Sequence, residues 1–130
     1  MFKSAIIILL TLPCIGLAGN NKTTALLDAL AMVESGGRCD AVGDKGKAVG
    51  ILQIWPVMVK DVNRISGRHY TLKDRLSKQK SYEICEIYFG KYCKGKSNEY
   101  KARCWNGGPQ GYKNPKTLKY WYKVEKELEK

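Results

Sequence analysis

The stretch GDKGKAVGILQI, residues 43–54, decides how this chain folds, and it follows a segment that ends AMVESGG at residues 31–37. That segment has a threonine start signal, places Leu27, Leu30 and Ala31 on one helical stripe, and stops at a glycine pair. Glycines in the later stretch permit tight turns and close approach to a ligand. Because the strand signals there are weak, we expect a glycine-rich loop or a short hairpin after the helix. A phosphate-binding loop is excluded, since the Lys-Ser/Thr pair and the preceding strand of that motif are missing.

Helical periodicity continues on the C-terminal side of this loop. Apolar residues recur at helical spacing in residues 56–67, where a proline opens the segment, and again in residues 81–93 and 116–130. A further helix is expected to begin at Thr71. A second glycine-rich stretch occupies residues 107–111, and neither internal repeats nor a low-complexity linker interrupt the chain. The sequence therefore predicts one small, mainly α domain.

The N-terminus has the features of a secretory signal peptide. A basic start and an apolar run over residues 5–12 lead to small residues that permit cleavage after Ala18. The alternative is an uncleaved membrane anchor, but Pro13 interrupts the run, which is shorter than the ~20 residues a bilayer span needs. We expect a signal peptide at residues 1–18, and a secreted or periplasmic domain at residues 19–130 without stable membrane insertion.

Cleavage would leave four cysteines, which in a small exported domain predict two disulfides. A zinc site is disfavoured because close cysteine pairs are missing and the sequence has a single histidine. Cys85 and Cys93 are eight residues apart on one expected helix, which is about 12 Å of rise and too far to bond directly. Two pairings remain, of which we favour Cys39–Cys85 with Cys93–Cys104.

The 130-residue chain carries a formal net charge of +11. For an exported protein, such a charge favours an anionic envelope polymer as partner over nucleic acid. No nucleic-acid-binding motif is recognisable, and export argues against such a role. We therefore expect no nucleic-acid partner, and we expect a monomer.

Glu34 is the carboxylate whose position is hardest to explain by folding alone. It follows Leu30 by four residues and so falls on the apolar stripe, in the last helical turn near the negative end of the helix dipole. Burial and the dipole both disfavour the anion, so the pKa of Glu34 should rise. A carboxylic acid that is still protonated near neutral pH is what general acid catalysis requires.

Five motifs in order make the chain resemble the soluble-type lytic transglycosylases and the goose-type lysozymes. In that superfamily a helix ends in Glu-Ser, followed by Gly-Leu-Met-Gln, a Tyr-Leu pair, Ala-Tyr-Asn-Ala-Gly-Pro-Gly, and a Thr-x-x-Tyr-Val-x-x-Val helix. The matching positions here are Glu34-Ser35, Gly50 to Gln53, Tyr88-Phe89, Cys104 to Pro109, and Thr117, Tyr120, Trp121 and Val124. The resemblance spans roughly residues 24–125 and implies a lysozyme-like (α+β) fold.

The resemblance also implies a site. Glu34 would be the catalytic acid, and Gln53 would present its amide to an N-acetyl sugar, with a buried amide that caps backbone groups as the alternative. Tyr88 and Tyr120 would line the cleft or be core aromatics. Trp105 replaces the family's tyrosine, so it can stack on a sugar but lacks the phenolic oxygen. The expected substrate-binding residues are Ser35, Gln53, Tyr88, Trp105, Asn106 and Tyr120.

Two reactions fit this resemblance, and both cleave the β-1,4 bond between N-acetylmuramic acid and N-acetylglucosamine in peptidoglycan. A hydrolytic lysozyme (muramidase) needs a second carboxylate, and Asp44 occupies the place of an aspartate in the goose-type Gly-Asp-Arg-Gly loop. The second goose-type aspartate, just past the glutamine, is replaced in the region of Ile54 and Trp55. We therefore favour the lytic transglycosylase, which needs one carboxylate. No metal or organic cofactor is implied, and a non-catalytic glycan-binding domain is the remaining alternative.

Overall fold

A computed structural model describes residues 21–130. The predicted signal peptide at residues 1–18 lies outside the described residues. The α-helices are α2 (Asn21–Ser35), α3 (Pro56–Ser66), α4 (Lys78–Tyr92), α5 (Asn98–Gly107) and α6 (Leu118–Leu128). The strands are β1 (Val42–Gly43) and β2 (Ala48–Val49). The expectation of a mainly helical domain is confirmed.

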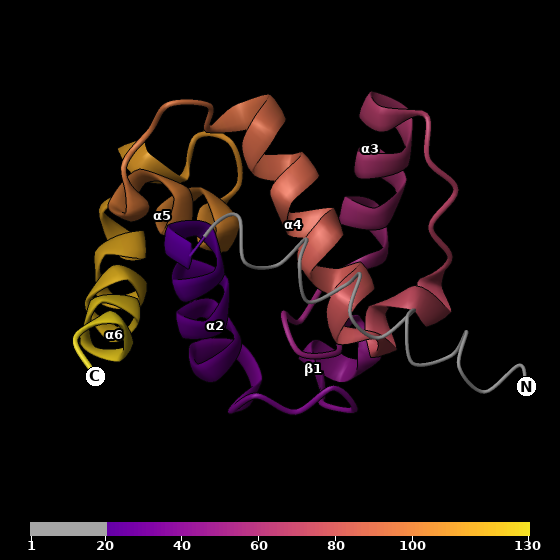
Figure 1. The fold of residues 1–130 in the computed structure, drawn as a ribbon, viewed down its shortest axis with the longest axis horizontal. Coiled ribbons are helices and arrows are strands. Elements are labelled where there is room, and N and C mark those ends of the chain that lie inside the picture. The colour runs from indigo at the N-terminus through magenta and orange to yellow at the C-terminus, as the bar shows by residue number, and fades with distance from the viewer. Residues whose placement is uncertain (1–20) are drawn as a thin grey trace, which may run out of the picture.

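The helices pack around one apolar core (Figure 1). α2 packs against α6, α5 packs against α6, and α3 packs against α4. The stripe predicted on α2 is buried, since Leu27 and Leu30 are among the least exposed side chains. The chain leaves the last turn of α2 and runs through a short loop into the hairpin (Figure 1).

The glycine-rich stretch forms the short hairpin that was one of the two expected outcomes. β1 and β2 are antiparallel, with Val42 opposite Val49, and a 3-10 turn, η1 (Asp44–Gly46), makes the tip. A bridge from Val49 to Ile54 extends the pairing toward α3. The hairpin therefore lies alongside the chain segment that enters α3.

One helical expectation needs correction, and one helix was not expected at all. Thr71 does not start an α-helix: it caps the 3-10 helix η2 (Leu72–Leu76) through a capping box with Asp74, and α4 begins only at Lys78 after the cap Ser77. The helix α5 was not predicted, and it includes Gly107 of the second glycine-rich stretch. Its buried face contains Arg103, which interrupts the apolar pattern that would have indicated a helix.

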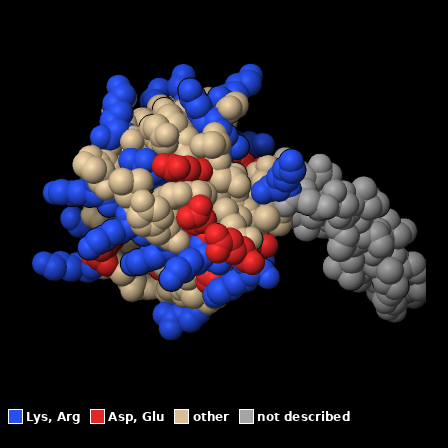
Figure 2. All heavy atoms as spheres, turned by 90° about the vertical axis from the view of Figure 1, so that its left-hand side faces the viewer, with Lys and Arg blue, Asp and Glu red and all other residues tan. Residues whose placement is uncertain are grey.

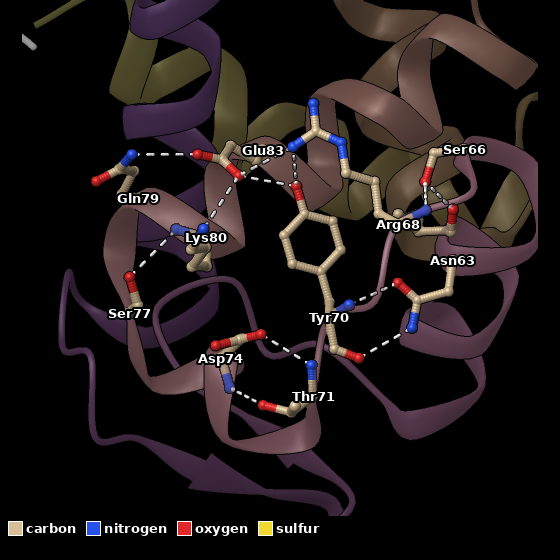
Figure 3. A network of polar contacts seen from close by, with 11 residues as sticks. Asn63, Ser66, Arg68, Tyr70, Thr71, Asp74, Ser77, Gln79, Lys80 and Glu83 are labelled. Carbon is tan, nitrogen blue, oxygen red and sulfur yellow. Dashed lines mark hydrogen bonds and ion pairs between the residues drawn. The ribbon is translucent and has the colours of Figure 1, made fainter.

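Polar contacts fix the connection between α3 and α4 (Figure 3). The Asn63 side chain donates to the carbonyl of Tyr70 (2.9 Å) and accepts from its N–H (2.8 Å). The Tyr70 hydroxyl in turn donates to Glu83 on α4 (2.8 Å). Tyr70 thus links the last part of α3, through Asn63, to α4, through Glu83.

The four cysteines of the described region are free thiols in this structure. Cys93 and Cys104 are neighbours: burial first, and then the adjacent Cys104 thiol, raises the pKa of Cys93 to about 12. Cys39 and Cys85 both lie close enough to Tyr82 to help raise the pKa of its phenol, after burial and Asp28. The two disulfides stay a prediction.

Candidate active site

A cleft of about 660 Å³ opens between the hairpin, the start of α3, and the end of α5. Five of the residues expected from the sequence line it together with Glu34, although they come from four separate parts of the chain. These five are Asp44, Gln53, Tyr88, Trp105 and Asn106. Ser35 and Tyr120 are not among the residues that line the cleft: Ser35 follows Glu34 in the chain, and Tyr120 is hydrogen-bonded to Glu34.

Glu34 combines burial with a single strong hydrogen bond. Its carboxylate oxygen Oε2 accepts from the hydroxyl of Tyr120 at 2.7 Å. Burial raises the pKa of Glu34 to about 7, the Tyr120 hydrogen bond opposes this rise, and the negative charge of Asp44 adds to it. The pKa rises as the sequence predicted, chiefly through burial, because an anion loses its hydration there. At neutral pH the Glu34 carboxyl is therefore protonated to a far greater extent than an ordinary glutamic acid side chain.

Ser35 ties the end of α2 to the chain segment after the hairpin. Its hydroxyl donates to the carbonyl of Ile51 (2.8 Å) and accepts from the backbone N–H of Arg38 (3.1 Å). This hydroxyl is engaged by the protein itself. Its role is to fix the last turn of α2, and therefore Glu34, against the hairpin.

Gln53 caps backbone groups, one of the two roles that the sequence left open, and it also lines the cleft. Its amide nitrogen donates to the carbonyls of Ala41 (3.1 Å) and Gly50 (3.0 Å), so the amide caps backbone groups. The side chain also lines the cleft, and its oxygen faces Gly43, where an added Cβ would lie 2.5 Å away. Its φ of 53° is unusual for a residue other than glycine, which indicates backbone strain at the cleft wall.

Aromatic side chains from α4 and α5 build the opposite wall. Tyr88 and Trp105 pack edge to face with their ring centroids 5.6 Å apart, and both are nearly buried. The Tyr88 hydroxyl donates to the carbonyl of Cys104 (3.4 Å). Asn106 follows Trp105 and is exposed at the cleft. Tyr88 is thus a core aromatic whose edge reaches the cleft.

Sequence reasoning missed the residues that α3 and the segment before it contribute to the cleft. These are Ile54, Trp55, Val57, Met58 and Asp61, and Gly108 and Pro109 were missed on the α5 side as site residues. No local signal marks these residues: Pro56 indicates where α3 starts, but the place of its first turns at the cleft depends on how α3 packs on the rest of the chain.

A buried arginine supports the hairpin wall. The guanidinium Nη1 of Arg75 donates to the carbonyls of Lys47 (3.0 Å) and Ile54 (2.9 Å), and its Nε donates to Leu72 (2.8 Å). Desolvation lowers the pKa of Arg75. One side chain thus fixes the outgoing end of the η1 turn to the segment that leads into Trp55.

The site has the parts that acid catalysis needs. A carboxylic acid that is held partly protonated at neutral pH in a cleft can donate its proton to a leaving oxygen atom, the step on which glycosidases depend. Among residues 21–130, no group of three or more His, Cys, Asp and Glu is placed to hold a metal ion.

The family comparison agrees with this chemistry. The model of the transglycosylase SLT domain matches residues 16–127, and the chain belongs to this family. It is therefore an enzyme of the peptidoglycan lytic transglycosylase type, with lysozyme activity compatible with the same family. Proteins with this domain act on peptidoglycan in the periplasm or the extracellular space.

No curated protein and no solved structure matches the chain. Within the part of the chain that the structure describes, none of the helices has the length and apolar character of a membrane span.

Proposed function

We propose that this protein is a lytic transglycosylase that cleaves the β-1,4 bond between N-acetylmuramic acid and N-acetylglucosamine, with Glu34 as the general acid. The observation that carries the proposal is the half-buried Glu34 carboxyl in the cleft, with its pKa raised to about 7. Family membership supports peptidoglycan as the substrate, and the geometry of the cleft supports Glu34 as the acid. We also propose export through the signal peptide at residues 1–18, and action as a monomer without a cofactor.

In the proposed reaction, one carboxyl group serves both half-steps. Glu34 gives its proton to the glycosidic oxygen as the bond from that oxygen to the muramic C1 breaks. The C6 hydroxyl of the same muramic residue then attacks C1, and its proton returns to the Glu34 carboxylate. The products are a 1,6-anhydro end and a free N-acetylglucosamine hydroxyl, and the enzyme is regenerated.

The other site residues fall into two groups: those that line the cleft and those that act through Glu34. Gln53, Tyr88, Trp105 and Asn106 line the cleft and are proposed to contact the sugars. Tyr120 acts through Glu34, because its hydroxyl holds the acid's oxygen at 2.7 Å. Ser35 contributes to catalysis by fixing the helix end that carries Glu34.

Hydrolysis is the second candidate, because Asp44 lines the same cleft and its charge reaches Glu34. In that reaction a water molecule attacks C1, Asp44 accepts its proton, and the product has a reducing end. Inverting glycosidases use two carboxylates in this way.

Glu34→Gln tests the proposal. The amide keeps the shape of the side chain and removes the transferable proton, so turnover of purified peptidoglycan should fall by about 10²–10⁴-fold. Mass spectrometry of the products then identifies the reaction, since anhydro-muropeptides indicate a transglycosylase and reducing ends indicate a lysozyme. Glu86→Gln, the same change on α4 outside the cleft, is the control. A Glu34→Gln protein with near wild-type turnover would falsify the assignment.

A further inference from the structure

Trp55 stands at the cleft in contact with the second carboxylate. It is the residue before α3, it lines the cleft, and 39% of its surface is exposed. Its indole Nε1–H donates to Oδ2 of Asp44 at 3.3 Å. A large apolar side chain left this exposed, with its one polar group turned to a carboxylate, is better explained by the cleft than by core packing.

Asp44 needs such a partner because of where it sits. It is exposed at the hairpin tip, and both Asp44 (φ 48°) and Lys45 (φ 57°) adopt left-handed backbone conformations. Strained residues in functional clefts persist only when their surroundings fix them. An untethered carboxylate on an exposed turn would sample many directions and would seldom point at a reacting atom.

The rest of the hairpin wall holds the tryptophan and the aspartate in one unit. The ammonium group of Lys47 lies over the Trp55 ring, 5.4 Å from its centroid. The Arg75 guanidinium bonds the carbonyl of Lys47 and the carbonyl of Ile54, the residues that flank this pair along the chain. Arg75 therefore restrains the backbone near both Asp44 and Trp55, which limits how far the two side chains can move apart.

We propose that Trp55 is a positioning residue that holds the Asp44 carboxylate toward a water molecule in the cleft and so determines the share of cleavage events that end in hydrolysis. The inference rests on the proposed function, because it assumes that Glu34 cleaves the glycan. In the hydrolytic branch, the water oxygen bonds to C1, its proton passes to Asp44, and the leaving oxygen has taken the Glu34 proton. In the other branch the C6 hydroxyl attacks and Asp44 takes no part.

The alternative role for Trp55 is that of a platform on which a sugar stacks. Loss of such a platform would weaken substrate binding before the two branches separate. It would therefore raise KM and leave the ratio of hydrolytic to anhydro products unchanged. The product ratio distinguishes the two roles.

The test compares Trp55→Phe, Asp44→Asn and the double variant with the wild-type protein. Phenylalanine keeps an aromatic ring and removes the indole N–H. The ratio of reducing-end to 1,6-anhydro muropeptides should fall about tenfold in Trp55→Phe, the size expected when a hydrogen bond to a charged group is lost. It should fall at least as far in Asp44→Asn, and the double variant should match Asp44→Asn, because Trp55 acts only through Asp44. Trp121→Phe, on α6 and outside the cleft, should leave the ratio unchanged.

The experiment distinguishes failure of the positioning role of Trp55 from failure of the proposed function. If the wild-type protein cleaves glycan but Trp55→Phe keeps its product ratio, or if the effects of the two substitutions multiply, the positioning role is overturned while the proposed function stands. The positioning role is also overturned, while the proposed function stands, if the wild-type protein and every variant yield anhydro products alone. A wild-type protein that does not cleave peptidoglycan at all overturns the proposed function, and this inference with it.

Discussion

At the scale of single residues, the behaviour of Glu34 depends on influences that oppose one another. Burial is the largest and raises the pKa, the hydrogen bond from Tyr120 lowers it, and the charge of Asp44 raises it. The general acid must be protonated to act. We therefore place the alkaline limb of the pH–activity profile near pH 7, the pKa of Glu34. Loss of Tyr120 or of Asp44 should move that limb in opposite directions.

Tyr120→Phe and Asp44→Asn provide this paired prediction. Tyr120 stabilises the Glu34 anion by donating to it, so its removal should shift the alkaline limb of kcat/KM to higher pH. Asp44 destabilises that anion, so Asp44→Asn should shift the limb to lower pH. The measurement is a pH profile on soluble glycan fragments, with Tyr82→Phe as the control because its hydroxyl bonds Asp28, a carboxylate outside the cleft. Shifts in the same direction would contradict this account of Glu34.

Glu34 could be found from the sequence because a carboxylate on an apolar stripe is a local anomaly. Gln53 could be placed at the cleft, but its bonds to Ala41 and Gly50 depend on a left-handed backbone that the sequence does not reveal. Trp55 and Asp61 could not be found, since their place at the cleft depends on how α3 packs on α4. Such packing is a long-range property with no local pattern.

At the scale of elements, the hairpin depends on the close approach of its backbone to the η2 segment. Gly50 has φ of +89°, and a Cβ there would lie 1.8 Å from the carbonyl oxygen of Arg75. Gly46 has nearly the same φ, +91°, but nothing lies within 4 Å of its Cβ position. The two glycines therefore share the conformational requirement and differ in the steric one.

This difference predicts unequal costs for the same substitution. Gly46→Ala should lower the free energy of unfolding by about 1–2 kcal/mol, the cost of a left-handed backbone for a residue with a Cβ. Gly50→Ala should cost clearly more, because the carbonyl of Arg75 must also move away. Urea denaturation of both variants measures the difference. Equal losses would show that the contact with η2 relaxes freely.

Most of the helices could be predicted because their apolar residues recur with the helical period. Helix α5 could not be predicted, because a buried arginine interrupts that pattern. Its buried Arg103 is satisfied by Thr117 (2.8 Å), Glu99 (2.7 Å) and the carbonyl of Tyr112 (2.8 Å). Two of these partners lie in the segment after the helix. From the sequence alone, a charged residue is expected to be exposed. Its burial is understood only when distant partners such as these are known.

The cysteines give a prediction about covalent links between elements. In the oxidised, exported protein we expect Cys39–Cys85, joining the loop after α2 to α4, and Cys93–Cys104, joining the end of α4 to α5. A bridge that closes loops of this size is worth roughly 3 kcal/mol. Peptide mapping without reductant tests the pairing. A peptide that joins Cys39 to Cys104 would refute it and leave the count of two bridges intact.

At the scale of the whole molecule, the outer surface is positively charged, whereas the charged residues that line the cleft are acidic. Figure 2 shows lysine and arginine side chains projecting around one face, with fewer acidic side chains among them. The chain has a net charge of +11, yet the residues that line the cleft include three carboxylates, Glu34, Asp44 and Asp61, and neither lysine nor arginine. We therefore propose that the cationic outer surface attracts the enzyme to an anionic wall polymer, whereas the cleft lining among the described residues supplies carboxylates.

The same buried acid makes the stability of the whole molecule depend on pH. The pKa of Glu34 is about 7 in the folded protein against 4.5 for the free side chain, so the folded state holds the proton more tightly. The resulting stabilisation is complete below pH 4.5 and is lost as the pH rises through about 7. It amounts to about 3 kcal/mol, from 1.36 kcal/mol per unit of pKa.

Glu34→Gln should remove this dependence, because an amide stays neutral at every pH. The difference in unfolding free energy between Glu34→Gln and the wild-type protein should therefore grow by about 3 kcal/mol in favour of the variant between pH 4 and pH 8. Urea denaturation across this range measures it, with Glu125→Gln on the exposed side of α6 as the control. Parallel stability curves for Glu34→Gln and the wild-type protein would mean that Glu34 is not buried enough to hold its proton, and the general-acid role would lose its physical basis.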